Sequence, residues 1–465
     1  MSTSLPIALE MAWFLSAVLF VYGLRRMSSP SRARSGIHLA GAGMLIAIAS
    51  MFVHPDLHTN HVLILIAIAC GGVLAFLHAR NVVMTDVPQL VALYNGLGGG
   101  AAAGIAIMAL LEVQDTNVAA NSFAVLGVLL GCITFAGSML AFRRLSSQVD
   151  TRSRFSSRQV TYLATGAFML LVGLLLAASS TAHPVLLLML VGLALAFGIM
   201  MTSPISAADM PVLISVYNAL TGLAVAADGY VLANPAMMVA GTLVFTAGSL
   251  LTRLMARAVN KRLSEIMYSG FGISHDSDEL NSGRDHVNTI DARDAAVDMA
   301  YSDRIVIVPG YGMATAQAQH KLRELTHLLE ERGVQTGFAI HPVAGRMPGH
   351  MNVLLAEAGV PYEKISDLNE INSEFSEIDV VLVVGASDIV NPAARDDTSS
   401  PLYGMPVLEV DRAKRVIVLK RGDGTGYAGI ENALLFTPVT RVLFGDARTS
   451  VQLSLIHISE PTRPY

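Results

Sequence analysis

Two clusters of residues in the last third of the chain have types and spacings that suit phosphate binding. The first is a glycine-rich turn, Gly310 and Gly312, in the segment PGYGMATAQAQ that follows the apolar run 305–308. In a strand–turn–helix unit such glycines let a pyrophosphate approach the backbone, and the helix N-terminus supplies N–H groups. The signal is weak by itself, because Thr315 stands where a third glycine is usual. A turn without a ligand fits the same residues.

The second cluster is the adjacent pair Lys420 and Arg421, at the end of the apolar run 416–419. An arginine fork and a lysine point charge bind phosphate, although a solvated basic pair is the alternative. A unit that binds NAD usually has an acidic residue at the end of its second strand. Here that strand runs into His341 and Arg346 with no acid between them. The missing acid and the two cations together favour NADP over NAD.

The sequence around these clusters alternates short β-rich runs with helical stretches. Strands are predicted at 304–308, 335–340, 379–384, 406–410, 415–420 and 441–444. Helices are predicted at 292–301, 312–331, 348–358, 369–377 and after Asp446. This alternation is typical of a Rossmann-like, doubly wound parallel sheet covered by helices. The third strand end places Ser387, Asp388 and Asn391 for contacts with a ribose or a nicotinamide amide.

The first 262 residues have the composition of a membrane protein. The chain is 53% hydrophobic and only 14% charged, against roughly 25% charged residues in soluble domains. Nine apolar stretches are long enough to span a bilayer: 7–24, 36–53, 62–79, 88–111, 122–142, 160–178, 183–202, 210–232 and 236–256. Glu10 interrupts the first, which favours a retained helix over a signal peptide. The predicted fold is therefore a polytopic all-α membrane bundle followed by a soluble α/β domain.

Basic residues indicate how the bundle is oriented. Arginines and lysines gather in the loops after the first, fifth and ninth stretches, whereas the loops 54–61 and 112–121 contain neither. Positively charged loops stay on the cytoplasmic side. This places the N-terminus outside and the α/β domain in the cytoplasm. The net charge of −5 gives no indication of nucleic-acid binding.

Two of the apolar stretches begin with the same pattern. The segments DVPQLVALYNGL (86–97) and DMPVLISVYNAL (209–220) share Asp, Pro, Leu, Tyr, Asn and Leu at identical spacing. A repeated helix pair in parallel orientation explains this match. Asp86 and Asp209 stand directly before the first helical turn, so they also fit a local role as helix starts.

Few side chains within the membrane half could do chemistry. Asn218, Thr221 and Asp228 lie on roughly one face of the eighth stretch. They fit helix–helix hydrogen bonding, and they also fit an ion or proton route. Three histidines in the loop 54–61 indicate a solvated loop rather than a metal site. Both cysteines lie inside apolar runs, so no disulfide or metal framework is predicted.

These patterns divide the chain into four segments. Residues 1–262 form the membrane domain and 263–295 a polar linker rich in Gly, Ser, Asp and Asn. Residues 296–452 form the soluble domain. The final segment, 453–465, resembles translated sequencing-adapter sequence, and we expect it to be non-native.

Longer motifs then identify a family. PGYGMATAQAQ, HPVAGRMPGHMNVLLAEA, GASDIVNPAA, GMPVLEV, KRGDGTGYAG and LFGDAR follow ADMPV in this order. Over residues 1–451 the chain resembles the β subunit of proton-translocating NAD(P) transhydrogenase. The resemblance implies that the soluble domain binds NADP(H) and that a separate α subunit carries NAD(H). It also implies direct hydride transfer between the nicotinamides while a proton crosses the membrane, with no catalytic residue and no metal.

The resemblance carries cofactor contacts over to matching positions. Lys420 and Arg421 are expected to hold the 2′-phosphate, Tyr427 to belong to a covering loop, and Asp446 to help close the site. The full set of predicted cofactor-binding residues is Gly310, Tyr311, Gly312, Met313, Ala314, Val343, Ala344, Gly345, Arg346, Met347, Pro348, Gly385, Ala386, Ser387, Asp388, Ile389, Gly404, Met405, Lys420, Arg421, Tyr427, Asp446 and Ala447.

In the membrane, Asp209, Asn218 and Asn95 match positions linked to proton passage. Some branches of the family have a proton-carrying histidine where this chain has Asn95, and an amide cannot exchange a proton near neutral pH. A partner subunit is therefore expected to supply that histidine. The resemblance further implies two copies of each subunit, in the lipid of a bacterial inner membrane. The alternative is a transporter or channel whose nucleotide domain only senses redox state.

Overall fold

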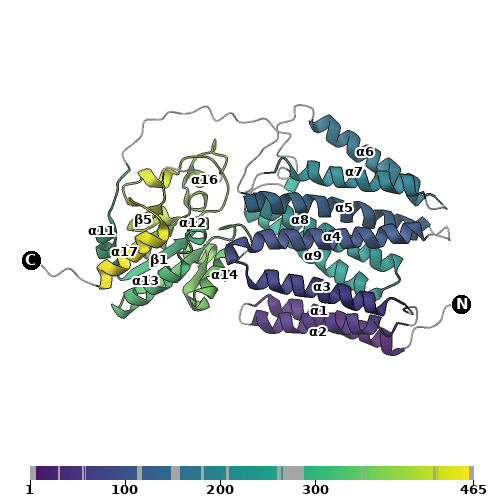
Figure 1. Cartoon of the computed structure of the whole chain (residues 1–465). Coiled ribbons are helices and arrows are strands. Elements are labelled where there is room, and N and C mark those ends of the chain that lie inside the picture. Colours follow the sequence, from purple (N-terminus) through teal and green to yellow (C-terminus); the bar gives the residue numbers. More distant parts are fainter. Residues whose placement is uncertain are drawn as a thin grey trace, which may run out of the picture. The chain divides into compact units, whose positions relative to one another are not determined.

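The computed structural model shows two compact units, which divide in sequence between Thr252 and Gly272 (Figure 1). The first unit is helical and the second is an α/β domain. The structure describes residues 7–29, 32–54, 57, 59–112, 118–147, 158–179, 183–205, 209–258, 263–264, 287–347, 349–422, 426 and 428–459.

The described part of the first unit contains nine helices long and apolar enough to cross a membrane. They are α1 (Ile7–Met27), α2 (Ala33–Met51), α3 (His61–Arg80), α4 (Val87–Leu111), α5 (Val118–Ser147), α6 (Arg158–Ala177), α7 (Pro184–Thr202), α8 (Met210–Val231) and α9 (Pro235–Ala258). Each predicted stretch falls on one of these helices, so the prediction of nine spanning helices is confirmed.

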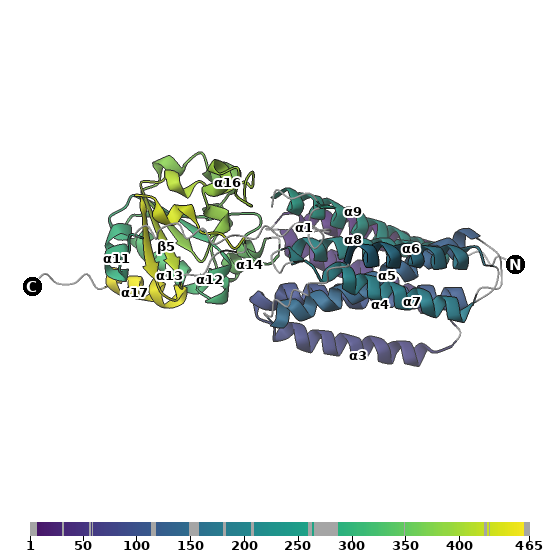
Figure 2. The ribbon, with the colours of Figure 1, turned by 90° about the horizontal axis from the view of Figure 1, so that it is seen from above.

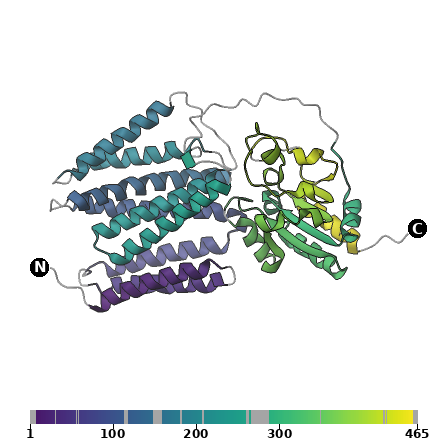
Figure 3. The same cartoon turned by 180° about the vertical axis from the view of Figure 1, so that it is seen from behind.

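Helix α5 is the centre of this unit, because it packs against α4, α6, α7 and α8. The labels of α4, α5 and α8 lie next to one another in Figure 1, and Figure 3 shows the unit from behind. Glycines allow the helices to approach closely. A Cβ atom at Gly131 would stand 2.6 Å from the carbonyl oxygen of Gly99, and one at Gly198 would stand 2.4 Å from that of Ile133. Small residues of this kind are what membrane helices use to pack tightly.

Hydrogen bonds join α5, α7 and α8 at one end of the unit. The guanidinium of Arg144 donates to the carbonyl oxygens of Ser203 (2.7 Å) and Ile205 (3.1 Å), just after α7. It therefore satisfies carbonyl groups that a helix end leaves unpaired. The hydroxyl groups of Thr202 and Tyr217 are 2.6 Å apart and buried. These contacts fix the end at which α8 begins.

The second unit is built on a six-stranded, fully parallel sheet (Figure 2). Its strands are β1 (Arg304–Pro309), β2 (Gln335–Ile340), β3 (Ile365–Asp367), β4 (Val380–Val384), β5 (Arg415–Lys420) and β6 (Thr440–Phe444), in the order β3-β2-β1-β4-β5-β6. Central strands such as β4 are buried along their whole length, as expected for a parallel sheet covered on both faces. The predicted doubly wound sheet is confirmed.

Helices cover this sheet. They are α11 (Ala292–Ala300), α12 (Tyr311–Thr315), α13 (Gln319–Glu331), α14 (His350–Glu357), α15 (Leu368–Ile371), α16 (Ala393–Asp396) and α17 (Ala447–Ser459). Helix α17 packs against α11, α13 and β5. It extends into the segment 453–465, where Leu455 and Ile458 are buried. The first part of the segment that we expected to be non-native is thus helical and packed.

The residues just before α11 join the edge of the sheet. The backbone N–H of Ile290 donates to the carbonyl oxygen of Val442 (3.0 Å), and that of Val442 donates to Asn288 (2.8 Å). The last part of the predicted linker therefore lies alongside β6. Most of the rest of the linker, 265–286, lies outside the described residues.

One predicted strand is wrong. Residues 406–410 were expected to pair in the sheet, but they form a loop that enters a short 3₁₀ helix at Val410. Leu408 bonds the carbonyl oxygen of Ile389, outside the sheet, through its N–H group (2.9 Å). Apolar residues bury equally well in such a loop, so hydrophobicity alone misled the prediction. The sixth strand is instead β3, which is too short to give a sequence signal.

The predicted helix 312–331 is two helices. Gln317 adopts a left-handed conformation (φ 48°) between α12 and α13. The N–H of Ala318 bonds the carbonyl oxygen of Met313 (3.1 Å), which closes the first helix. The predicted helix 369–377 is likewise broken into α15 and a 3₁₀ turn. Neither break has a glycine or proline to mark it.

Candidate functional site

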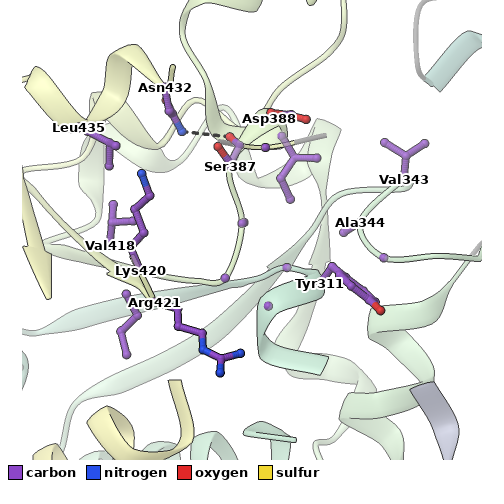
Figure 4. Close-up of a pocket in the computed structure, with 18 of the residues that line it drawn as sticks. Tyr311, Val343, Ala344, Ser387, Asp388, Val418, Lys420, Arg421, Asn432 and Leu435 are labelled. Atoms are coloured by element: carbon purple, nitrogen blue, oxygen red, sulfur yellow. Dashed lines mark hydrogen bonds between the residues drawn. The ribbon is translucent and has the colours of Figure 1, made fainter. Parts of the chain in front are cut away.

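A cavity of about 410 Å³ lies at the carboxyl ends of β1, β4 and β5 (Figure 4). The chain leaves β1 toward β2 and leaves β4 toward β5, so this is the switch point at which doubly wound sheets bind ligands. The residues that line the cavity are Gly310, Tyr311, Gly312, Val343, Ala344, Gly345, Arg346, Gly385, Ala386, Ser387, Asp388, Ile389, Val418, Leu419, Lys420, Arg421, Gly426, Asn432 and Leu435. Its volume is in the range of small-molecule sites.

Glycines of two strand ends are in direct backbone contact at the base of this cavity. The N–H of Gly312 donates to the carbonyl oxygen of Gly385 (2.9 Å), and that of Gly310 donates to Val384 (2.9 Å). A Cβ atom at Gly385 would stand 2.4 Å from the Cα atom of Gly312. Gly385 also has φ +63°, a conformation that glycine adopts without strain. The turn after β1 and the turn after β4 therefore fix each other.

This contact changes the expected way of holding a phosphate. Helix α12 has only five residues, and the N–H of Gly312 is already bonded to Gly385. A long helix that presents free N–H groups, as expected from 312–331, is not what the structure shows. Positive charge for a phosphate must therefore come from side chains around the cavity.

Three cations that line the cavity, one in the loop after β2 and two at the end of β5, can supply that charge. The guanidinium carbon of Arg346 lies 4.5 Å from the ring centroid of Tyr311, a cation–π contact that orients both side chains. Lys420 ends β5 and Arg421 follows it. Figure 4 shows Lys420 on one side of the cavity, with Tyr311 and Ala344 on the opposite side. Within the described residues, neither Lys420 nor Arg421 has an acidic partner.

Two buried histidines hold the loop that carries Arg346. The Nε2 atom of His341 lies 2.6 Å from the carbonyl oxygen of Pro406, and its Nδ1 atom accepts the N–H of Val343 (3.2 Å). The Nδ1 atom of His350 accepts the N–H of Arg346 (3.0 Å). Burial lowers the pKa of His341, and burial and the nearby Arg346 lower the pKa of His350. Both rings are therefore neutral at pH 7, as an accepting Nδ1 atom requires.

The far wall of the cavity is tied together by Asp388 and Asn432. The Asp388 carboxylate accepts the N–H of Ala428 (2.9 Å), and the Asn432 amide donates to the carbonyl oxygen of Ser387 (3.0 Å; Figure 4). Asn391 does not line the cavity. It is fully buried and its amide bonds backbone groups on the two sides of the wall. The expectation that Asn391 contacts a ligand is wrong, because its hydrogen-bonding groups are used internally.

The structure separates the predicted cofactor residues into groups. Most of them line the cavity together. Met313 and Ala314 are fully buried, and Gly404 and Met405 line a second hollow of about 400 Å³. Met347, Asp446 and Ala447 are also not among the lining residues. Asp446 instead accepts the N–H of Thr449 (3.2 Å) at the start of α17. Pro348 and Tyr427 lie outside the described residues.

Five lining residues were not predicted: Val418, Leu419, Gly426, Asn432 and Leu435. Val418 and Leu419 belong to β5 and could have been found from their position just before Lys420. Asn432 and Leu435 come from a loop and a 3₁₀ turn after the glycine-rich segment. No spacing in the sequence marks them.

The repeated residues in the membrane unit have different surroundings. The amide of Asn95 donates to the hydroxyl of Ser138 (3.0 Å), whereas Asn218 is exposed on the surface of α8. Tyr94 is also exposed, but Tyr217 is fully buried. Asp209 is buried directly before α8 and makes no side-chain cap of that helix. The sequence repeat is thus not a repeat of contacts.

Comparisons with known proteins agree with this architecture. A family model described as NAD(P) transhydrogenase beta subunit matches residues 9–456. Two proteins from Rhodospirillum rubrum, both named NAD(P) transhydrogenase subunit beta, are similar to this chain. Each is 41% identical over 447 residues, which is 94% of this chain and 96% of the relative.

We predict that Gly385→Ala destabilises the α/β unit by roughly 3 kcal/mol, from left-handed strain and overpacking together. Gly333→Ala is the matched control, because Gly333 has φ +87° but no atom within 4 Å of an added Cβ atom. It should cost only about 1 kcal/mol. Pulse proteolysis of the purified chain in urea measures both changes. Equal costs for the two variants would contradict the contact between the strand ends.

We also predict that protonation of His341 destabilises the α/β unit. Its pKa is lowered on folding, so the unfolded state, with a pKa of about 6.5, binds more protons below that value. Stability is therefore full above about pH 6.5 and falls as the pH drops further. His341→Gln keeps a donor for Pro406 without titrating, and it should weaken this fall. Stability of this variant should still fall somewhat with falling pH, because the pKa of His350 is lowered as well.

Urea midpoints of the full chain between about pH 7 and 5.5 test this prediction. His327→Gln is the control, because the His327 side chain is exposed. An unchanged pH dependence in His341→Gln would show that this ring is protonated without cost.

Proposed function

The chain belongs to the NAD(P) transhydrogenase beta subunit family, and from that premise we propose that its α/β unit binds NADP(H) in the cavity between β1 and β4. Membership makes the chain a multi-pass membrane protein and the β subunit of an enzyme. It also implies an α subunit as partner. We propose three further points: which residues hold the cofactor, what the partner does, and how the chain is oriented in the membrane.

The observation that carries the proposal is the pair Lys420 and Arg421 beside a strand end without an acid. Lys420 lines the cavity at the end of β5 and Arg421 follows it. A 2′-phosphate is the group that distinguishes NADP from NAD, and it suits an arginine fork with a lysine charge. An acid after β2, which would favour the free ribose of NAD, is replaced there by His341 and the loop to Arg346.

The other contacts follow from the shape of the cavity. The interlocked glycines leave no side chain between a pyrophosphate and the turn after β1. Arg346, held over Tyr311, supplies charge to that side. Ser387 and Asp388 offer polar groups for the ribose and the carboxamide. Of the remaining predicted contacts, Gly404 and Met405 would reach the cofactor only if the loop that carries them moves.

The chemistry of the site needs no general acid or base. The nicotinamide of NADP(H), when bound, accepts or releases the hydride. Burial keeps His341 and His350 neutral; His341 bonds backbone groups through both ring nitrogens, and His350 accepts a backbone N–H through Nδ1. This chain therefore positions the cofactor and excludes water, while the α subunit presents NAD(H) for direct transfer.

Proton movement is proposed to involve Asp209, Asn218 and Asn95. Asn218 is exposed on α8, and a polar side chain on the outside of a membrane helix calls for a partner. A helix of the α subunit that carries a histidine would meet this need, since neither asparagine can carry a proton. The assembly would hold two copies of each subunit in a bacterial inner membrane, with the N-terminus outside and the cofactor in the cytoplasm.

We predict that Lys420→Gln and Arg421→Gln each weaken NADP⁺ binding by about ten- to a hundredfold, since a charge-assisted contact contributes roughly 1.5–3 kcal/mol. Binding of NAD⁺ should change little. Arg415→Gln is the matched control, because Arg415 lies at the opposite end of β5 and pairs with Asp298. Isothermal titration of the wild type and the three variants with both nucleotides gives the affinities needed. Equal losses for NADP⁺ and NAD⁺ would argue against a 2′-phosphate site.

A further inference from the structure

A carboxyl group lies deep in the membrane unit without any described hydrogen-bond partner. Asp228, near the end of α8, is fully buried, and neither oxygen of its carboxyl is hydrogen-bonded within the described residues. The hydroxyl of Thr221, two turns earlier on α8, is in the same situation. A buried polar group left unpaired costs roughly 1–3 kcal/mol. Helix–helix hydrogen bonding, one of the two readings of these residues, therefore does not explain Asp228.

The carboxyl of Asp228 lies against a glycine of a neighbouring helix. A Cβ atom at Gly127 of α5 would stand 2.4 Å from the Oδ1 atom of Asp228 and 2.9 Å from the Cβ atom of Ala106 in α4. Three helices therefore meet at this carboxyl. At the next residue, a Cβ atom on Gly229 would stand 2.6 Å from the backbone nitrogen of Met238 in α9. An ion in such surroundings is costly, so the carboxyl is neutral unless a proton leaves it for a nearby acceptor.

No charged side chain among the described residues faces this site. Besides Asp228, the titratable groups of the four helices and their ends are Asp86, Tyr94, Glu112, Cys132, Arg143, Arg144, Asp209, Tyr217, Tyr230, Arg253 and Arg257. By helix position, only Glu112 and Tyr230 are at the same end as Asp228. Both are exposed, and Tyr230 packs against Phe123 with ring centroids 4.4 Å apart.

We propose that Asp228 is a proton-carrying residue that links the outer aqueous phase to the polar groups Thr221 and Asn218. This inference rests on the proposed proton translocation and orientation. Asp228 lies ten residues beyond Asn218 on α8, which is about 15 Å along the helix and toward its outer end. The carboxyl takes a proton from outer water and releases it toward the basic group that the α subunit supplies near Asn218. In the reverse reaction the proton passes through the same groups in the opposite order. Only the carboxyl and that basic group gain or lose the proton.

The test uses this chain with its α subunit in sealed vesicles that contain a trapped pH indicator. Asp228→Asn keeps the shape of the side chain but cannot carry a proton, so proton translocation driven by NADH and NADP⁺ should fall by about a hundredfold. Asp228→Glu should restore much of it. Thr252→Val is the control, because Thr252 is buried in α9 but hydrogen-bonded to Ser215 (3.0 Å). It should translocate like the wild type.

Each outcome decides the matter. Wild-type translocation by Asp228→Asn would overturn the inference and leave the proposed function intact. Absence of translocation by the wild-type complex would remove the proposed function, and the inference with it. Should Asp228→Asn fail to assemble, infrared spectra of the wild type and Asp228→Glu provide a second test. A carboxylic C=O band that responds to pH and differs between the two supports the inference, and the absence of such a band overturns it.

Discussion

The contact between Gly312 and Gly385 is the constraint on which the cofactor site depends. It brings the backbone of the turn after β1 against the backbone of the turn after β4. At this point of the sheet, successive strands begin to be added on the opposite side of β1. A side chain on either glycine would separate the turns by the width of a methyl group or more. Because this contact uses the Gly312 N–H, the usual helix-terminus contact with a phosphate is reduced. Arg346, Lys420 and Arg421 are therefore the main source of positive charge at the site.

The same division between backbone shape and side-chain charge explains how the site can favour NADP. In the function that we propose, the glycines accept any dinucleotide, whereas the cations at the end of β5 select one with an additional phosphate. The loop with Arg346 is held by two neutral histidines that accept backbone N–H groups. Acidification would protonate those acceptors, which couples the geometry of the loop to pH without a catalytic role for either ring.

The sequence predicted most of this organisation because its signals were local and strong. The nine apolar stretches predicted the membrane helices, and the alternation of strands and helices predicted the parallel sheet. The motifs around Gly310 and Lys420 predicted residues that line the cavity. What failed depended on tertiary packing. The buried loop at 406–410 has the hydrophobicity of a strand, and Gln317 breaks a helix without glycine or proline. Asn432 lines the cavity only because the chain folds back over Ser387, and no spacing in the sequence shows such a return.

The most direct test of the central claim follows the hydride itself. The chain, assembled with its α subunit, is given NADH that carries deuterium at the transferred position, together with NADP⁺. If NADP(H) occupies the cavity at β1 and β4 and faces NAD(H) on the partner, the deuterium appears undiluted in NADPH, because no solvent proton enters the transfer. NADP⁺ that binds but receives no deuterium would contradict the account and favour a chain that only senses the nucleotide.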